Sequence, residues 1–570
     1  MNAYLPPTDD MHFILHQVLN APEQLQALPA HAETDAELMR QVVEEAGKFV
    51  GEVISPLNRD GDEIGALWKA GSVTTPPGFR EAYQAFWQAG WPALSAATED
   101  GGQGLPTVLE AMLYEMLSAA NHGWTMAPGL LHGAYECLKH HGSDALKAAY
   151  LEKVATGEWL ATMCLTEPHA GSDLGLVRTK ALPIADSRYA LNGTKIFISG
   201  GEHDLSDNIV HLVLARLPES PPGPKGLSLF LVPKFYEDGS RSLVVCERIE
   251  EKMGLHGSPT CVMCFDDAPG WLIGEAGKGL NAMFVMMNAA RLHVGLQGIG
   301  LLEAAWQKAD AYAKERRQMR APGSGSPAGQ ADPIENHPAV RRLLDAQRAW
   351  IDAGRVVAYR TALEIDTLKH GADPVQKAAA NRWCALVTPI LKAAWTDQAF
   401  TGASACLQVF GGHGYVREWG IEQHVRDARV AMIYEGTNEI QAIDLLVRKV
   451  LPDGAQSLLT LLDELLTDLP ESAHNGATAA ALRQFAAFTR NSLIPRTQAA
   501  DASTDLPYWL ADDFLRALAL LLMAWAWERI ADTPGAEATR WRTAQRGFWR
   551  WVWPEFEMRL TMMRATLLPA

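Results

Sequence analysis

The apolar pattern of the chain changes twice, near Ala161 and near Gly279, and these two changes constrain its fold more than any other feature. Before the first change, apolar residues recur at helical spacing, as in Leu109, Met112 and Leu113. Between the two changes lie about six short apolar runs bounded by turn residues, a spacing typical of a small β-sandwich or barrel. After Gly279 the long helical patterns return.

This alternation predicts an α+β multidomain protein. We expect an N-terminal helical domain over residues 1–160, a β-sandwich or barrel over 161–278, a four-helix bundle over 279–452 and an additional helical domain over 453–570. At ~100–200 residues per domain, a chain of 570 residues is long enough for such a division. Within the β domain, the Asn192-Gly193 pair predicts a hairpin turn, because a type I′ turn needs positive φ at both central residues.

Charge and cysteine content narrow the class of protein. The 50 basic and 67 acidic residues give a net charge of −17, which argues against a general nucleic-acid binder. Seven cysteines, an odd number in a long chain, favour a reducing compartment over a disulfide framework. The N-terminus has no basic segment followed by an apolar core, and the apolar run 514–527 is too short to cross a bilayer. We therefore predict a cytoplasmic protein without a nucleic-acid or membrane partner.

Two other features have competing interpretations. Cys261 and Cys264 form a C-x-x-C pair within an apparent strand, where residues three apart point to opposite faces. No second pair or histidine cluster with zinc spacing accompanies them, so we interpret them as core thiols and predict no metal site. The Trp- and Leu-rich segment after Leu506 is expected to pack on the rest of the chain or on a second subunit. A helix on a membrane surface is the alternative, which the acidic residues of this segment disfavour.

Three segments contain residues suited to chemistry. Residues 163–173 are expected to form a strand followed by a loop with small and hydroxyl side chains. Such a loop could bind the polar edge of a cofactor, or it could be an ordinary turn. Residues 408–415 have three glycines in four positions, which allow a ligand to approach the backbone, but they follow a helix and lack the dinucleotide fingerprint. In residues 433–440, Glu435 precedes a glycine and a helix. It could be a general base or a first-turn acid that the helix dipole stabilises.

Taken together and in this order, these segments resemble the acyl-CoA dehydrogenase family over roughly residues 40–450. The shared motifs are MCLTEPHAGSD (163–173), LNGTKIFISGG (191–201), YAKERRQ (312–318), QVFGGHGY (408–415), RDAR (426–429) and IYEGTNEIQ (433–441). The chain also resembles a subgroup of larger members that includes 3-methylthiopropionyl-CoA dehydrogenases. It shares with them Tyr4, Pro7 and Asp10, the IENHPAVRR run (334–342) and the extra C-terminal helical segment.

The resemblance implies FAD as cofactor and α,β-dehydrogenation of an acyl-CoA thioester to the 2-enoyl-CoA. The base of the family falls on Glu435, whose backbone N–H, with the ribityl 2′-hydroxyl of FAD, is expected to stabilise charge on the thioester oxygen. Phe197 and Ser199 stand where many members have Trp and Thr. The implied flavin-ring contacts are Met163, Leu165, Thr166, Phe197 and Ser199. The other implied cofactor contacts are Arg316 and Gln318 on the diphosphate of a neighbouring subunit's FAD, Gln408, Gly411 and Gly412 near that FAD, and Thr437 and Glu439 beside Glu435. For Arg316 the alternative is a solvated helix charge.

The resemblance also implies a substrate and partners. Ser172 is expected to contact CoA, with Gly436, Asn288 and Arg291 near the thioester. Asn288 stands where members have an acid, and a structural ion pair is the alternative for Arg291. We expect a short- or medium-chain acyl-CoA, including 3-methylthiopropionyl-CoA, an electron-transfer flavoprotein as acceptor, and a homodimer. The alternatives are an acyl-CoA oxidase that uses O₂ and an inactive flavin- or CoA-binding scaffold.

Overall fold

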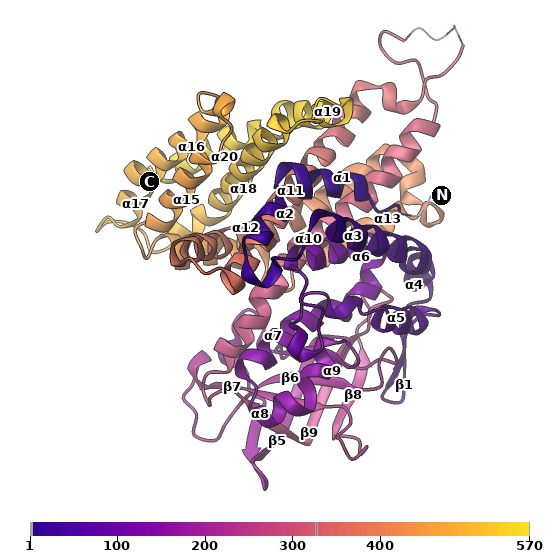
Figure 1. Cartoon of the computed structure of the whole chain (residues 1–570), viewed down its shortest axis with the longest axis vertical. Helices are drawn as coiled ribbons and strands as arrows, with labels where there is room; N and C mark the ends of the chain where they lie inside the picture. The colour runs from indigo at the N-terminus through magenta and orange to yellow at the C-terminus, as the bar shows by residue number, and fades with distance from the viewer. Residues whose placement is uncertain (1–3, 325–326, 328, 569–570) are drawn as a thin grey trace. The chain divides into compact units, whose positions relative to one another are not determined.

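The computed structural model describes residues 4–324, 327 and 329–568. The chain forms two compact units (Figure 1). The first comprises Met1–Lys48, Ala111–Ala119 and Val294–Ala570, and the second comprises Phe49–Glu110 and Ala120–His293. The predicted fold class is confirmed: N-terminal helices, a β-barrel, a helical bundle and further C-terminal helices follow one another along the chain.

The N-terminal part is helical, as predicted, with one small addition. Helix α6 begins at Thr107 directly after Pro106, where the sequence predicts a helix start. A two-stranded antiparallel sheet, β1 (Leu67–Lys69) and β2 (Ser72–Thr74), interrupts the helices and is not anticipated by the sequence. The helices are α1 (Thr8–His12), α2 (Ala21–Gln26), α3 (Ala36–Phe49), α4 (Asn58–Ile64), α5 (Phe79–Gln88), α6 (Thr107–Thr125), α7 (Leu131–His141), α8 (Asp144–Leu146) and α9 (Glu152–Ala155).

Seven strands form the β domain, and their pairings close on themselves. In turn β6 pairs with β7, β7 with β9, β9 with β5, β5 with β4, and β4 with β6, which makes a barrel. The six runs identified in the sequence all fall on strands, and the short β4 is the additional one. The strands are β3 (Leu160–Cys164), β4 (Lys180–Pro183), β5 (Arg188–Ser199), β6 (Ile209–Arg216), β7 (Leu227–Pro233), β8 (Val244–Ile249) and β9 (Thr260–Ile273).

The hairpin predicted at Asn192-Gly193 is wrong, because these residues lie inside the continuous strand β5. The pairing of β5 with β9 shifts register between Leu191 and Gly193, so the pair marks a bulge. Asn192 exchanges two hydrogen bonds with Asp267 across the strands, at 2.8 and 3.0 Å. A Cβ on Gly193 would lie 2.3 Å from the Thr179 hydroxyl oxygen, so the glycine is required by close approach and not by a turn.

Three long helices build the bundle, with shorter helices beside them, and the first unit contains α10 only from Val294 onward. Trp350 of α11 and Trp395 of α12 meet edge to face with ring centroids 5.4 Å apart, and both indoles are buried. These helices match the long helical patterns expected after Gly279. The bundle helices are α10 (Gly279–Glu315), α11 (Pro338–His370), α12 (Pro374–Val409), α13 (Ile421–Ala431) and α14 (Asn438–Ile443).

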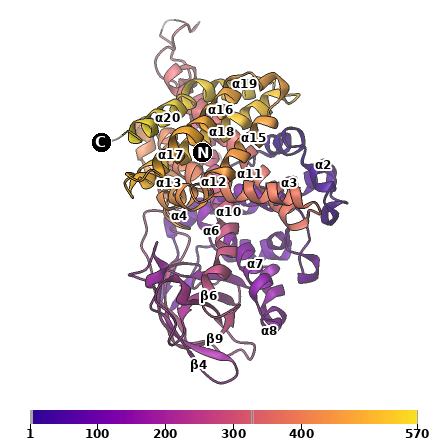
Figure 2. The ribbon, with the colours of Figure 1, turned by 90° about the vertical axis from the view of Figure 1, so that its left-hand side faces the viewer.

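The C-terminal helices cover the apolar helix α18 (Leu506–Asp532) within the chain itself. α18 packs against α11, α12, α16 and α20, and both views show α16 and α20 beside it (Figures 1 and 2). Trp525 and Trp527 are fully buried, which disfavours the membrane-surface interpretation. Of the helices that the structure describes, none is long and apolar enough to cross a membrane. The remaining helices are α15 (Gln456–Thr467), α16 (Ala477–Phe488), α17 (Ile494–Thr497), α19 (Thr539–Gly547) and α20 (Pro554–Thr566).

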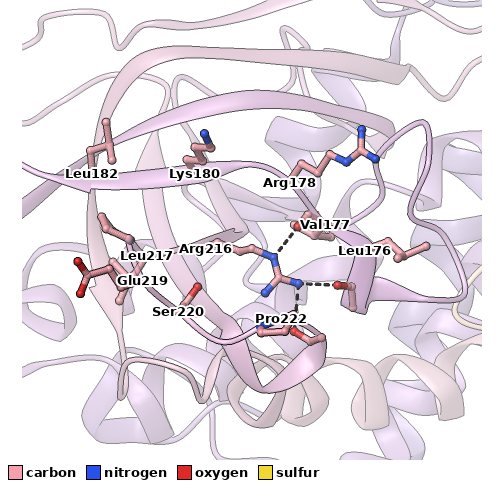
Figure 3. Close-up of a pocket in the computed structure, with 13 residues that line it drawn as sticks. Leu176, Val177, Arg178, Lys180, Leu182, Arg216, Leu217, Glu219, Ser220 and Pro222 are labelled. Atoms are coloured by element: carbon pink, nitrogen blue, oxygen red, sulfur yellow. Dashed lines mark hydrogen bonds between the residues drawn. The ribbon is translucent and has the colours of Figure 1, made fainter.

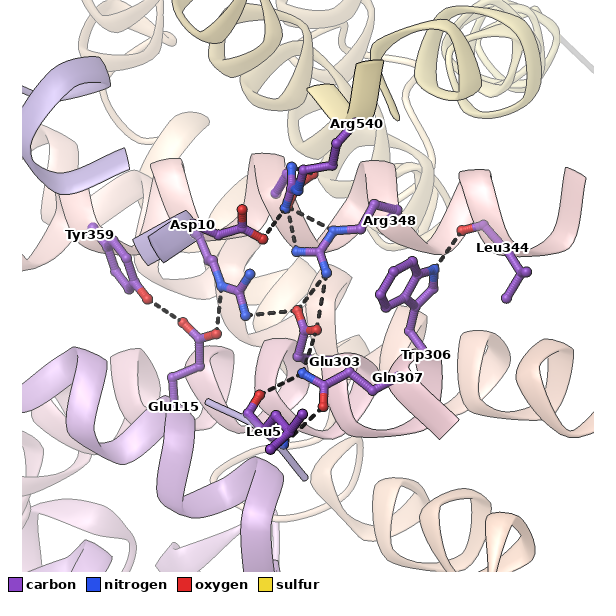
Figure 4. A network of polar contacts seen from close by, with 12 residues as sticks. Leu5, Asp10, Glu115, Glu303, Trp306, Gln307, Leu344, Arg348, Tyr359 and Arg540 are labelled. Atoms are coloured by element: carbon purple, nitrogen blue, oxygen red, sulfur yellow. Dashed lines mark hydrogen bonds and ion pairs between the residues drawn. The ribbon is translucent and has the colours of Figure 1, made fainter. Parts of the chain in front are cut away.

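A buried network of charges ties together distant segments of the first unit (Figure 4). Arg355 of α11 donates from Nε to Glu115 of α6 at 2.7 Å and from Nη2 to Glu303 of α10 at 2.8 Å. Glu303 also accepts from Arg348 at 2.8 Å. Arg348 and Arg540 both donate to Asp352, and Arg540 of α19 also pairs with Asp10 of α1. Residues from both ends of the chain therefore meet on α11 (Figure 4).

Within this network the ionised form of Asp352 is stabilised by its neighbours. Burial alone would raise the pKa of Asp352, but the neighbouring cations Arg348 and Arg540 lower it to about 2. Because this pKa is depressed in the folded state, the contribution of Asp352 to stability is present above its ordinary pKa of 3.8. That contribution is lost as the pH falls through about 2.

Candidate active site

Glu435 lies on a strained turn between α13 and α14. Its φ is +54° and that of Gly436 is +83°, so two consecutive residues have left-handed backbone conformations. A non-glycine residue held there costs of order 1–3 kcal/mol, and such outliers gather at functional sites. Glu435 is half-buried and precedes Thr437, which caps α14 by accepting a hydrogen bond from the Ile440 N–H. It is therefore outside the first turn of α14, and the alternative interpretation as a first-turn acid is wrong.

Side chains from α12 and α14 fix this turn. Asn438 accepts a hydrogen bond from Lys392 Nζ at 2.9 Å and donates to the Ala393 carbonyl at 3.1 Å. Gln441, fully buried, donates from Nε2 to the Glu435 carbonyl at 2.9 Å. The backbone of Glu435 is thus held from its C-terminal side by buried polar groups.

The surroundings of Glu435 are partly shielded from water. The preceding Tyr434 donates its hydroxyl to Gln297 Oε1 at 2.5 Å, and burial, followed by the charge of Glu435, raises the pKa of Tyr434. Glu439, one turn further along α14, is exposed. Hydrogen bonds from its own backbone N–H and from the Thr437 hydroxyl lower the pKa of Glu439. The two glutamates of this loop therefore have different environments.

In the second unit, a buried ion pair joins the two segments predicted to contact the flavin ring. Lys195 of β5 donates from Nζ to Glu167 Oε1 at 2.9 Å and to the Leu165 carbonyl at 3.0 Å. Burial alone would raise the pKa of Glu167, but Lys195 and the hydrogen bonds from Thr179 and Arg178 hold it below its ordinary value. The backbone N–H of Ile196 also donates to the Thr166 carbonyl at 2.9 Å. Leu165 and Thr166 are therefore beside β5, whereas Met163 lies on β3, which pairs with β6; all three residues are half-buried.

A bulge turns Phe197 of β5 outward. The pairing of β5 with β9 shifts register between Lys195 and Ile198, and Phe197 has a φ of +60°. Its ring is 61% exposed, which is unusual for a phenylalanine between the buried residues Lys195 and Ile198. Ser199, at the end of the strand, is half-buried. An exposed aromatic ring on a strained backbone has the character of a ligand platform and not of a core residue.

All five residues predicted near the FAD diphosphate line one pocket of about 520 Å³ in the first unit: Arg316, Gln318, Gln408, Gly411 and Gly412. Arg316 follows the last residue of α10 and is exposed. It stands at the pocket and not on a helix face, which disfavours the solvated-helix alternative. Tyr312, Phe410 and His413 form an aromatic wall, and the Tyr312 hydroxyl hydrogen-bonds His413 Nδ1 at 2.9 Å.

The glycines of this pocket fit a ligand that needs close approach to the backbone. A Cβ built on Gly411 or Gly412 would meet no atom within 4 Å, and both residues are exposed. Gly411 has a φ of +59°, a conformation that glycine adopts readily. A guanidinium beside open backbone suits a diphosphate, which accepts several hydrogen bonds. These residues therefore fit the polar part of FAD.

A second pocket, of about 770 Å³, lies on the β domain (Figure 3). Arg216 is part of its wall and donates to the carbonyls of Val177 at 2.7 Å and Gly223 at 3.0 Å. Arg178 and Lys180, both exposed, also line it. Arg178 and Lys180 are two residues apart along an extended segment, so both cations lie on one face. This spacing is visible in the sequence, but neither residue belongs to the motifs shared with the family.

The residues predicted to bind substrate have different environments. Ser172 is exposed in the loop that follows the Glu167–Ala170 bridge. Arg291 of α10 is 8% exposed. Asn288 lies in α10, but its side chain falls outside the described residues. Gly436 belongs to the Glu435 turn, where a Cβ would lie 2.7 Å from Gln441 Nε2, so glycine is required there.

Comparisons with known proteins identify the family to which the chain belongs. Family models of the N-terminal, middle and C-terminal domains of acyl-CoA dehydrogenases match residues 36–158, 162–268 and 277–450. The 3-methylmercaptopropionyl-CoA dehydrogenase of Ruegeria pomeroyi is 44% identical over 487 residues, which are 85% of this chain and 82% of that protein.

Two solved structures show the same fold. Caenorhabditis elegans ACDH-11 in complex with C11-CoA has a TM-score of 0.77 at 19% identity, covering 99% of this chain and 96% of that one. An acyl-CoA dehydrogenase from Bacillus anthracis complexed with FAD has a TM-score of 0.75 at 22% identity, covering 96% of this chain and 91% of that one.

The chain therefore belongs to the acyl-CoA dehydrogenase family. It is an FAD-dependent oxidoreductase that acts on acyl-CoA thioesters.

Replacing Arg316 with alanine is expected to weaken FAD binding. A charge-assisted hydrogen bond of this kind contributes roughly 1.5–3 kcal/mol, or about one to two powers of ten in affinity. The measurement is the FAD retained after dialysis, determined from flavin absorbance. Arg317→Ala is the matched control, because Arg317 donates to the Ala331 carbonyl at 3.2 Å and does not line the pocket. Equal FAD retention in both variants would return Arg316 to the role of a solvated charge.

Proposed function

We propose that this protein desaturates a short- or medium-chain acyl-CoA to the 2-enoyl-CoA, with Glu435 as the base that removes the α-proton. The observation that carries the proposal is the strained Glu435–Gly436 turn, whose half-buried glutamate has its backbone carbonyl held by a hydrogen bond from Gln441. Backbone strain of this kind gathers at functional sites, and here it coincides with a half-buried carboxylate.

The residues of the candidate site have proposed roles either in proton removal or in holding FAD. We propose that Glu435 takes the α-proton on its carboxylate and that its backbone N–H stabilises charge on the thioester oxygen. FAD supplies the acceptor for the β-hydrogen, which leaves as hydride when the Cα–Cβ double bond forms. We propose that Met163, Leu165, Thr166, Phe197 and Ser199 hold the flavin ring, and that Arg316, Gln318, Gln408, Gly411, Gly412, Thr437 and Glu439 hold the remainder of the cofactor.

The CoA part of the substrate needs cationic and polar groups. We propose that Ser172 contacts the CoA portion and that Gly436, Asn288 and Arg291 serve the thioester. Arg178 and Lys180 give the second pocket a positive face, which suits the CoA phosphates (Figure 3). The acyl group we propose is 3-methylthiopropionyl or a straight chain of similar length, because the relative from Ruegeria pomeroyi carries that substrate in its name.

We also propose a cytoplasmic enzyme that passes its electrons to an electron-transfer flavoprotein. A panel of acyl-CoAs assayed with an artificial electron acceptor tests the substrate class. Activity is expected to be highest on 3-methylthiopropionyl-CoA or straight short-chain substrates. A maximum on long-chain or branched substrates contradicts the proposed class. Rapid turnover with O₂ alone would favour the alternative acyl-CoA oxidase.

The assembly we propose is a homodimer, in which Arg316 reaches the FAD of the neighbouring subunit. In this arrangement the helices after residue 455 occupy surface that a second dimer covers in smaller, tetrameric relatives. Light scattering is expected to give twice the chain mass of 62.3 kDa. A stable tetramer, or a monomer that retains FAD, would contradict this assembly.

A further inference from the structure

A cluster of two histidines and one aspartate lies outside the candidate active site. Asp366 and His370 are one turn apart on α11, and His31 belongs to the short 3-10 helix η2 (Pro29–His31). One ligand atom from each of the three side chains lies within 4.8 Å of those of the other two. His31 Nε2 and Asp366 Oδ1 are 3.9 Å apart, and the rings of His31 and His370 meet edge to face at 4.9 Å.

The imidazole of His31 is a second and independent sign of a ligand. Its side chain is 3% exposed, and neither ring nitrogen has a hydrogen-bond partner among the described residues. Buried polar groups are nearly always hydrogen-bonded, so two such nitrogens in one buried ring need an explanation. The ring is held in place by its backbone: the His31 N–H donates to the Leu28 carbonyl, and its carbonyl accepts from the Thr34 N–H, both at 2.9 Å.

The C-terminal end of α11, where Asp366 and His370 lie, favours the binding of a cation. Residues at i and i+4 share one helix face, which places the Asp366 carboxylate and the His370 imidazole side by side. His370 is the last residue of α11, where the helix dipole attracts positive charge. Asp366 is buried, with 1% exposure, and supplies a negative charge, while Lys369 in the same turn supplies an opposing one. His370 is exposed, so an ion can enter from solvent and keep a water as its fourth ligand.

We propose that His31, Asp366 and His370 bind one zinc ion, which links the N-terminal segment to the end of α11. Two imidazoles and one carboxylate are ligands that zinc accepts, and a tetrahedral site places ligand atoms roughly 3.4 Å apart. The 3.9 Å between His31 Nε2 and Asp366 Oδ1 therefore has to close by only about 0.5 Å. Mg²⁺ does not suit the site, because it prefers oxygen ligands.

The test is a zinc titration of the FAD-loaded protein, purified without a histidine tag and stripped with a chelator. Zinc binding is followed by competition with a coloured chelator and by elemental analysis. One equivalent per chain is expected for the wild type, and it should be lost in His370→Ala. Because His370 is exposed, this variant is expected to keep its fold, and a circular dichroism spectrum checks that. Zinc should also raise the thermal unfolding midpoint of the wild type but not that of His370→Ala, and Mg²⁺ should raise neither.

His140→Ala is the matched control. His140 is an exposed histidine whose Nε2 lies 3.2 Å from Glu136 Oε2, a histidine–carboxylate pair outside the proposed site. The His140→Ala variant should bind one equivalent of zinc, as the wild type does. Asp366→Asn, which removes another proposed ligand, is a second variant that should lose zinc. If this variant does not fold, the result for His370→Ala is sufficient. No stoichiometric zinc in the wild type, or an unchanged equivalent in folded His370→Ala, would overturn the proposal.

Discussion

Replacing Glu435 with glutamine is expected to slow the reduction of bound FAD by acyl-CoA by at least the ~10²–10⁴-fold typical of general-base catalysis. Glutamine keeps the shape of the side chain but cannot accept the α-proton. Removal of the proton and of the hydride is coupled, so the flavin should stay oxidised even at saturating substrate. Folding and the yellow colour should survive, because the Gln441 hydrogen bond is to the backbone of Glu435 and not to its side chain. Stopped-flow absorbance measures the rate.

Glu439→Gln is the internal control for that experiment. It changes the same residue type one helical turn along, at an exposed position where the carboxylate is near the Thr437 cap. Flavin reduction should be affected much less, with at most some loosening of FAD. If the two variants behave alike, or Glu435→Gln reduces its flavin at the wild-type rate, then Glu435 is not the base.

The second large effect is expected on stability, from Arg355→Met in the buried charge network (Figure 4). Methionine has similar length and removes the charge that Glu115 and Glu303 share. Both carboxylates are buried, and breaking a buried ion pair by removing one partner costs about 3–5 kcal/mol. The first unit should therefore unfold at a clearly lower temperature or urea concentration. Circular dichroism, dominated by the helices of this unit, follows the transition.

Arg448→Met is the control for the network. Arg448 also lies on a helical segment with a carboxylate four residues earlier, but its side chain is 66% exposed and its distance to Asp444 is 3.9 Å. An exposed pair of this kind contributes about 0.2–1 kcal/mol at most. A shift in Arg355→Met no larger than in Arg448→Met would show that the network adds little to stability.

Periodicity in the sequence is sufficient to predict the order of the helical and β regions, but not the small β1–β2 sheet or the short strand β4. The start of α6 at Pro106-Thr107 and the other strands of the β domain follow from local signals. The hairpin at Asn192-Gly193 is the exception, because its turn signal is overridden by pairing with β9 on both sides. The Asn-Gly dipeptide favours a tight turn when considered alone. In the fold it lies inside a strand, where the close approach of Thr179 requires glycine.

The candidate site also has a part that the sequence predicts and a part that only the fold shows. Motifs along the chain indicate Glu435 and the pocket around Arg316, because each motif is continuous in the sequence. The Glu167–Lys195 ion pair joins two motifs through contacts that no spacing encodes. The outward turn of Phe197 depends on a bulge in β5. The cluster of His31, Asp366 and His370 could not be predicted either, because its members come from two separate segments of the first unit that are far apart in the sequence.

The most direct test of the proposed activity is an anaerobic titration of the purified yellow protein with acyl-CoAs, followed by flavin absorbance. We expect 3-methylthiopropionyl-CoA or a straight short-chain acyl-CoA to bleach the flavin in one step, with the matching 2-enoyl-CoA as product. Colour should return on addition of an artificial electron acceptor. A flavin that stays oxidised with every acyl-CoA, in protein that binds FAD, would contradict the proposed dehydrogenation and leave an inactive scaffold.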